Sequence, residues 1–91
     1  MYYILFYKTV EDYIEKRVPF REAHLKLAME SFNRGELMLA GALTDPSDSA
    51  VLVFKCENPS AAEEFAKNDP YVLNGIVTEW KVRPWTVVIG G

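Results

Sequence analysis

The chain has 91 residues, of which 49% are hydrophobic and 25% are charged, and its formal net charge is −3. This length suits one compact domain (1–91) and is too short for two, and the composition is that of an ordinary globular protein. No segment approaches the roughly 20 apolar residues of a membrane span, and a negative charge without a Lys/Arg cluster disfavours nucleic acids and anionic membrane surfaces as partners.

Two residues with metal-binding or redox potential each occur only once, Cys56 and His24. A single cysteine excludes an intrachain disulfide, and the two residues cannot supply a zinc site without further ligands, so we predict no bound metal. We expect Cys56 to be a buried thiol at a strand end. The apolar run after Met1 is too short for a signal peptide and has no basic segment before it, which predicts a cytoplasmic location.

The first part of the chain predicts a strand, a connection and a long helix. Residues 2–7 are all aromatic or aliphatic, which is typical of a strand covered on both faces. Residues 8–18 are polar and indicate a loop with at most a helical turn. Residues 19–35 predict the main helix, because Pro19 suits its first turn and Gly35 suits its C-terminal stop.

One stripe of this helix faces the predicted core and contains the histidine. At about 100° per residue, the stripe consists of Phe20, His24, Leu27, Ala28 and Ser31. A second apolar stripe beside it consists of Leu25, Met29 and Phe32. The combined arc is wider than one sheet needs. Either neighbouring elements cover the helix or part of it meets another subunit, and we expect a mixture of the two. An inward-facing histidine is either a proton-exchanging group or a buried neutral side chain with a satisfied hydrogen bond.

The middle of the chain predicts an antiparallel hairpin. Residues 36–43 and 50–56 are two strand-like runs, and residues 44–49 between them have turn chemistry throughout. Gly41 lies inside the first run. A glycine there indicates a bulge or the close approach of another group to the backbone.

The last third predicts two helical segments and a final strand. Asn58 and Pro59 are a cap and first position for a helix, and Asp69 repeats this role before the turn that ends at residues 74–75. Residues 76–82 then alternate as a strand does, and we expect the apolar residues 86–89 to pair with a sheet edge.

The predicted order is β-α-β-β-α-β, which is typical of ferredoxin-like α+β folds. Such a fold has a four-stranded antiparallel sheet with both helices on one face. We expect every strand to present apolar side chains to the other face, and such a face is rarely left in water. A homodimer with its sheets packed face to face is the simplest solution, and the wide apolar arc of the main helix leaves room for a higher oligomer.

Several short motifs together resemble the YciI-like (YCII-related) family of small bacterial proteins over nearly the whole chain. They are Arg21-x-x-His24-Leu25, the small-residue turn at Gly41, Asp69-Pro70-Tyr71 followed by Gly75, and Pro84-Trp85. Each motif is weak alone, and the assignment rests on their order and spacing. The resemblance implies a ferredoxin-like fold that dimerises as in the dimeric α+β barrel group.

The resemblance also implies a site. In this family the residues that align with His24 and Asp69 are regarded as an active-site pair in a pocket, and one branch is associated with dehydrochlorination of a chlorinated hydroxyhydroquinone. The chain departs from the common pattern at residues 42–43, where a Gly-Pro pair is frequent, and this affects the pocket wall.

A His–Asp pair suits general acid/base chemistry, because the carboxylate fixes the imidazole tautomer and leaves the other nitrogen for a substrate proton. The alternative is structural: Asp69 only caps the turn at Pro70, and His24 only donates a hydrogen bond to it. Arg21, one helical turn before His24, either reaches an anionic oxygen or pairs with a surface Glu. The aromatic residues that could line a cavity for a flat ring, or belong to the core or an interface, are Tyr3, Phe6, Tyr7, Tyr71 and Trp80.

The leading hypothesis is a small cofactor-free lyase or isomerase that acts by dehydrohalogenation or proton transfer on a cyclic or aromatic substrate. His24 and Asp69 are its expected catalytic residues, and Arg21, Tyr71 and Gly41 its expected substrate-binding residues. The alternative is a non-catalytic dimeric protein that binds a small molecule. A third hypothesis is a haem-associated role with His24 as axial ligand.

Overall fold

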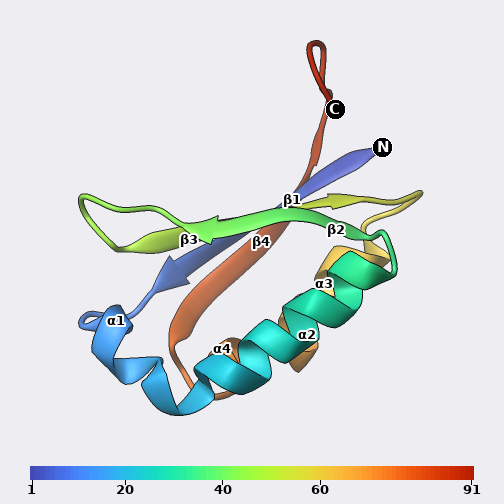
Figure 1. Cartoon of the computed structure of the whole chain (residues 1–91). Helices are drawn as coiled ribbons and strands as arrows, with labels where there is room; N and C mark the ends of the chain where they lie inside the picture. Colours follow the sequence, from blue (N-terminus) through green and yellow to red (C-terminus); the bar gives the residue numbers. More distant parts are fainter.

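The computed structural model describes all 91 residues. The elements follow one another as shown in Figure 1. They are β1 (Tyr2–Thr9), α1 (Tyr13–Lys16), a 3-10 turn η1 (Val18–Phe20), α2 (Arg21–Asn33), β2 (Leu37–Ala42), β3 (Ser49–Lys55), α3 (Ser60–Asn68), α4 (Pro70–Leu73) and β4 (Val77–Trp85).

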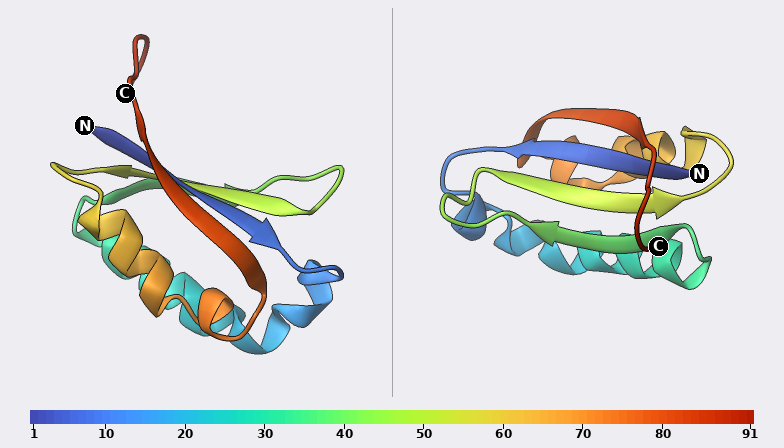
Figure 2. Two further views of the ribbon diagram at one scale, coloured as in Figure 1. Left: turned by 180° about the vertical axis from the view of Figure 1, so that it is seen from behind. Right: turned by 90° about the horizontal axis from the view of Figure 1, so that it is seen from above.

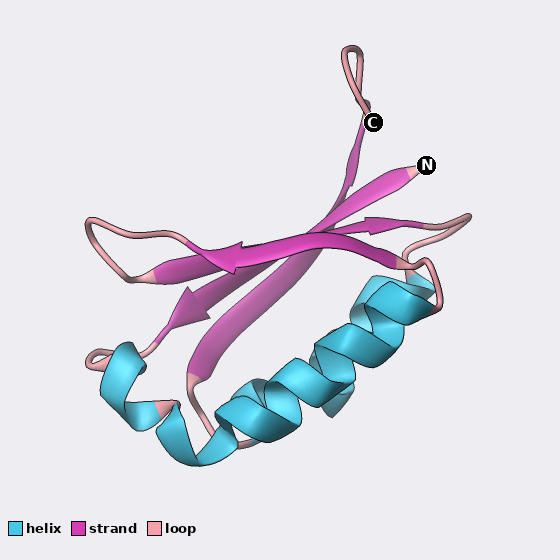
Figure 3. Ribbon diagram, viewed as in Figure 1, coloured by secondary structure: helices cyan, strands magenta, loops and turns pink.

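The four strands form one antiparallel sheet in the order β2-β3-β1-β4. All helices lie on one side of this sheet (Figure 3), and α2 and α3 run side by side beneath it when the molecule is seen from behind (Figure 2). The prediction of an α+β, ferredoxin-like arrangement is therefore confirmed.

The hydrophobic core lies between the sheet and the helices. The central strands alternate, so that Leu5, Leu52 and Phe54 point inward and are almost completely buried. From the other side α3 contributes Ala62, Phe65 and Ala66, the face that its spacing predicts, and the rings of Phe54 and Phe65 meet edge to face.

The outer face of the sheet is apolar over β1, β2 and β3 and mostly charged over β4. Phe6 in β1 and Val51 in β3 lie opposite each other on this face, while β4 places Lys81 opposite Phe6 and Glu79 opposite Lys8. The prediction that every strand offers apolar side chains to this face is met by only one residue, Trp85 opposite Tyr2, in β4. Its outward charges take part in local contacts instead, since the Lys81 ammonium lies 5.6 Å from the Phe6 ring centre.

Several element boundaries differ from the prediction. Pro19 lies in the separate 3-10 turn rather than in α2, because the chain changes direction before the helix begins. β4 extends to Trp85, beyond residue 82. Residues 86–89 do not pair with a sheet edge: β4 passes the start of its partner β1 at the Tyr2–Trp85 pair, and the tail projects from the body (Figure 1).

Burial also differs at two predicted strand positions. Cys56 follows β3 and is half-buried, where a buried thiol was expected. β2 is one of the two edge strands, and only Leu37 of its residues is buried. None of the helices has the length and apolar character needed to cross a membrane.

Candidate active site

The histidine and the predicted aspartate come from segments that are far apart in the sequence. His24 lies one turn into α2, in the stripe that faces the sheet. Asp69 lies between α3 and α4 in an extended conformation, with Pro70 as the first residue of the short helix. The expected cap is present, because the Asp69 side chain accepts a hydrogen bond from the Tyr71 backbone N–H.

Three donors converge on the Asp69 carboxylate, which is completely buried. His24 Nδ1 lies 2.8 Å from Oδ1, and the Tyr71 N–H donates to the same oxygen at 3.0 Å. The Tyr7 hydroxyl donates to Oδ2 at 2.7 Å from β1. The carboxylate therefore links α2, α4 and the central strand β1. In the sequence His24 is 45 residues and Tyr7 is 62 residues away from Asp69.

These contacts assign the proton on the imidazole. An ionised carboxylate only accepts hydrogen bonds, so the nitrogen that faces Asp69, Nδ1, carries the hydrogen. In the neutral imidazole the second nitrogen, Nε2, then has its lone pair available, and His24 lines a pocket. A group in this state accepts a proton from a substrate and returns it.

Two aromatic rings hold the imidazole in place. The Tyr71 ring stacks on it at a centroid distance of 3.8 Å with an interplanar angle of 6°, and the Phe65 ring meets it edge-on at 6.3 Å. Together with the bond to Asp69 these contacts restrict both the position and the tilt of His24, whose side chain is 16% exposed.

A cavity of about 190 Å³ lies beside this pair, between α2 and the β2–β3 half of the sheet. Its lining is mostly apolar and contains no carboxylate. The lining residues are Tyr7, Thr9, Tyr13, Arg17, Arg21, His24, Leu25, Ala28, Ala40, Gly41, Ala42, Ala50, Leu52, Tyr71 and Val77.

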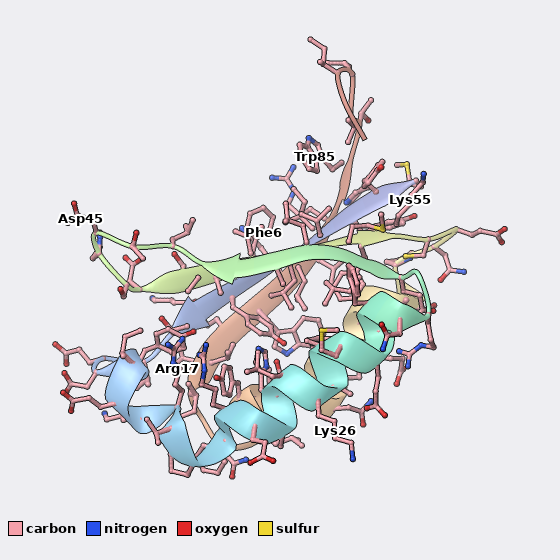
Figure 4. The ribbon with its side chains drawn as sticks, in the orientation of Figure 1. Phe6, Arg17, Lys26, Asp45, Lys55 and Trp85 are labelled. Atoms are coloured by element: carbon pink, nitrogen blue, oxygen red, sulfur yellow. The ribbon has the colours of Figure 1, made fainter.

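One end of the cavity is basic. Arg17, which follows α1, and Arg21, which begins α2, both line it, and neither forms an ion pair with a carboxylate. Arg17 Nη1 donates to the Tyr13 hydroxyl at 2.8 Å. Figure 4 shows Arg17 beside α1, under the sheet.

Two tyrosines of the site are held in the protonated form. Burial, the Asp69 charge and the hydrogen bond to Asp69 raise the pKa of Tyr7 far above its ordinary value. Burial raises the pKa of Tyr71, and the neighbouring Arg17 and Arg21 charges partly offset this rise. Both hydroxyls are therefore hydrogen-bond donors at neutral pH.

The structure brings the predicted residues to one place. His24 and Asp69 are in contact, and Arg21, Tyr71 and Gly41 all line the same cavity as His24. The prediction of a close approach at Gly41 is wrong, since a Cβ there would meet nothing within 4 Å, and the bulge of β2 lies between residues 37 and 39.

The other aromatic candidates divide between three places. Tyr7 lines the cavity, Tyr3 belongs to the core, and Phe6 and Trp80 line a separate surface hollow. A haem group does not suit the cavity, because about 190 Å³ is below the size of pockets for much smaller drug-like ligands, roughly 300–1,000 Å³.

Sequence analysis missed Thr9, Tyr13 and Arg17. A partial signal was present, because Tyr13 and Arg17 are four residues apart, which brings their side chains to one side of the short helix α1, whereas Arg21 belongs to the separate helix α2. The prediction of a loop with a helical turn over residues 8–18 agrees with α1, but it assigns these side chains no place in the tertiary structure.

The fold and the site define a small ferredoxin-like α+β protein with a His–Asp pair at an apolar pocket that has one basic end. The YCII-related domain matches residues 1–86, and the chain belongs to this family. The resemblance drawn from the short motifs is thereby confirmed.

Known relatives share its whole length. An uncharacterised protein of Haemophilus influenzae is 32% identical, with 97% of this chain and 99% of the relative covered. Protein YciI of Escherichia coli O6:H1 is 29% identical with the same coverage. The chain is also similar to the solved structure of the 5-chloro-2-hydroxyhydroquinone dehydrochlorinase of Burkholderia phenoliruptrix AC1100 in complex with 2,5-dihydroxybenzoquinone. That match has a TM-score of 0.77, 17% identity and 94% coverage of both chains, and it shows a shared fold.

Proposed function

We propose that the chain is a small cofactor-free enzyme of the lyase or isomerase type, which transfers a proton on a small cyclic or aromatic substrate. His24 Nε2 is the acid/base atom, and Asp69 orients the imidazole from its buried position. The observation that carries the proposal is the 2.8 Å contact between His24 Nδ1 and Asp69 at the wall of a cavity.

The reaction needs only groups that the cavity holds. The base removes a proton from the substrate, and the electron pair left behind forms a new π bond. In a dehydrohalogenation the carbon–halogen electron pair departs with the halide, and the imidazolium then releases its proton to water. In an isomerisation the imidazolium returns the proton to another substrate atom. Neither course consumes an oxidant or a reductant. The dehydrochlorinase with the same fold, whose substrate is a hydroxylated chlorinated ring, supports this choice of chemistry.

Turnover tests the proposal. Wild-type protein is incubated with 5-chloro-2-hydroxyhydroquinone and a panel of hydroxylated and halogenated rings, and halide release and ring absorbance are followed. We expect His24→Gln, whose side chain cannot exchange a proton, to lower the rate by about 10²–10⁴-fold. Lys26→Gln is the matched control, because Lys26 is exposed on the same helix and points away from the sheet (Figure 4). Product formation that is equal in the wild type and His24→Gln would contradict the proposal.

A second candidate is a non-catalytic protein that holds a small molecule in the same cavity. The structural role of Asp69 favours this second candidate, since the three hydrogen bonds of Asp69 cap α4 and join three elements. Stabilisation of the protein by a panel compound without product formation would support this candidate over the enzyme.

We also propose that the protein acts in the cytoplasm as a homodimer whose sheets pack face to face. The support is the uncovered apolar part of the outer face, formed by β1, β3 and the edge strand β2, where Leu39 is 71% exposed. A second copy covers both such faces with one interface. Val51→Glu should give a monomer in sedimentation analysis, whereas Lys26→Glu on the polar side of α2 should not. A monomeric wild type would overturn the dimer.

A further inference from the structure

We propose that the basic end of the cavity, defined by Tyr13, Arg17, Arg21 and the Tyr71 hydroxyl, binds an anionic oxygen of a small ring, either a phenolate or a carboxylate. The inference rests on the proposed function for placing a ring beside His24. It goes further in assigning the charge of the ligand and the residues that select it. Binding alone tests it, without any turnover.

The charge balance of the cavity is the first argument. Two guanidinium groups line it and no carboxylate does. Neither Arg17 nor Arg21 has an acidic partner within ion-pair distance, and the nearby Asp69 already accepts three hydrogen bonds, from Tyr7, His24 and the Tyr71 backbone. An anion is therefore the group that this end of the cavity lacks.

Unpartnered hydroxyls are the second argument. The Tyr71 hydroxyl is buried, in a residue that is only 2% exposed, and no acceptor takes its proton. Its neighbours include both arginines, and Arg21, the one that interacts with it most directly, can only donate to its oxygen. Buried polar atoms in native proteins are nearly always hydrogen-bonded, because an unpaired one loses its hydration without compensation. Since the Tyr71 hydroxyl stays protonated, an oxygen atom supplied by a ligand could accept its hydrogen bond.

Two further hydroxyls extend the same pattern. The Tyr13 hydroxyl accepts a hydrogen bond from Arg17, so its own proton is free to be donated. Thr9 Oγ1 also lines the cavity and has no partner, in a residue that is 8% exposed. The site thus offers a donor for a second ligand oxygen, as a hydroxylated or carboxylated ring would provide.

The size of the cavity sets the ligand's shape. A dry protein cavity of about 150 Å³ is known to hold benzene, and this one measures about 190 Å³. One six-membered ring with small substituents therefore fits. The wall beside the basic end is formed by small and aliphatic side chains such as Leu25, Ala28 and Leu52, which suit the faces of such a ring.

Matched ligand pairs test the charge preference by calorimetry. Benzoate is compared with benzamide, and 4-nitrophenolate with 4-nitroaniline; within each pair the shape is similar and the charge differs. We expect the anion of at least one pair to bind at least tenfold more tightly than its neutral partner, and the pair that does so identifies the carboxylate or the phenolate as the preferred group. Equal affinities within both pairs, or no binding of either anion at millimolar concentration, would overturn the inference.

Variants locate the preference. Arg17→Gln and Arg21→Gln should each weaken the anion roughly tenfold to a hundredfold, the range expected for one lost charge-assisted hydrogen bond. Affinity for the neutral partner should stay the same. Lys26→Gln is the control and should change neither ligand. Arginine variants that weaken both members of a pair equally, or neither, would show that the two arginines do not select the charge.

Tyr71→Phe separates binding from folding, because it keeps the ring that stacks on His24 and removes only the unpartnered hydroxyl. We expect unchanged thermal stability with weaker anion binding. Unchanged anion binding would remove Tyr71 from the site. A protein that prefers anions through Arg17 and Arg21 but releases no product would leave the binding site established and the enzymatic proposal rejected.

Discussion

The two ends of the cavity differ in how completely their polar groups are paired. At the Asp69 end both carboxylate oxygens are hydrogen-bonded, and His24 is held by a hydrogen bond and a stacked ring. At the basic end two guanidinium groups have no anionic partner, and the proton of the Tyr71 hydroxyl has no acceptor. The first end is complete within the protein, while the second is incomplete without a ligand.

This contrast separates two ways in which polar groups serve a small protein. Paired groups at the Asp69 end contribute to stability and fix the geometry of the imidazole. Unpaired groups at the basic end contribute nothing to stability and become useful only when a ligand arrives. Substitutions at the Asp69 end should therefore lower mainly the free energy of unfolding, and substitutions at the basic end should weaken mainly ligand binding.

The largest effect on folding is expected for Asp69→Ala. It leaves the buried Tyr7 hydroxyl and the Tyr71 N–H without an acceptor and His24 without its partner. We expect a loss of about 3–5 kcal/mol in the free energy of unfolding, measured by urea denaturation. Glu64→Ala, at an exposed carboxylate on α3, is the control and should stay within about 0.5 kcal/mol of the wild type. A small loss of stability for Asp69→Ala would mean that the Asp69 end of the cavity contributes no more to stability than the basic end.

Tyr7→Phe should have the next largest effect. It removes one hydrogen bond to the buried Asp69 carboxylate and keeps the ring in the core. Hydrogen bonds to charged groups contribute about 1.5–3 kcal/mol, and we expect a loss in that range. Urea denaturation at neutral pH measures it. If the variant were as stable as the wild type, Asp69 would not depend on its Oδ2 partner.

Alkaline pH should act on the same contact. The raised pKa of Tyr7 keeps its proton on the folded chain, whereas the unfolded chain loses that proton above the ordinary value of 10.0. The stability that this tyrosine contributes is therefore present below pH 10 and falls as pH rises further, by at most about 1.4 kcal/mol per pH unit. Unfolding free energies measured on either side of pH 10 should fall less steeply for Tyr7→Phe than for the wild type. Identical slopes would contradict the raised pKa.

The smallest effect on folding is expected for Thr9→Val at the incomplete end. The substitution replaces an unpartnered hydroxyl with a methyl group of similar size, so no hydrogen bond is lost. Thermal unfolding should show stability that is unchanged or higher by up to about 1 kcal/mol. A clear loss of stability would show that the Thr9 hydroxyl has a partner in the folded protein without ligand, and that the two ends are less different than proposed.

Local patterns in the chain were sufficient to predict the architecture and the cap at Asp69. The alternation of strands, the amphipathic helices and the Asp69-Pro70 cap depend on neighbours in sequence, and the structure contains them with shifts of a few residues. The failed predictions concern positions whose environment is set by distant segments. Residues 86–89 have the composition of a strand but no free partner, and Cys56 is only partly covered.

The candidate site was predictable only in part for the same reason. His24 and Asp69 could be singled out, because helical spacing and the family's motifs point to them. Thr9, Tyr13 and Arg17 could not be assigned to a cavity from a segment that resembled a loop, and nothing in the sequence shows that the Tyr71 hydroxyl lacks a partner.

By itself the sequence determined the order of the main helices and strands and the cap at Asp69, since these properties follow from the spacing of side chains along one backbone. Tertiary structure alone decided that Tyr7, His24 and Asp69 share one hydrogen-bonded centre, and that two arginines remain without a carboxylate. Distances between residues 45 and 62 positions apart in the chain are set by how the layers pack, and no local pattern contains that information.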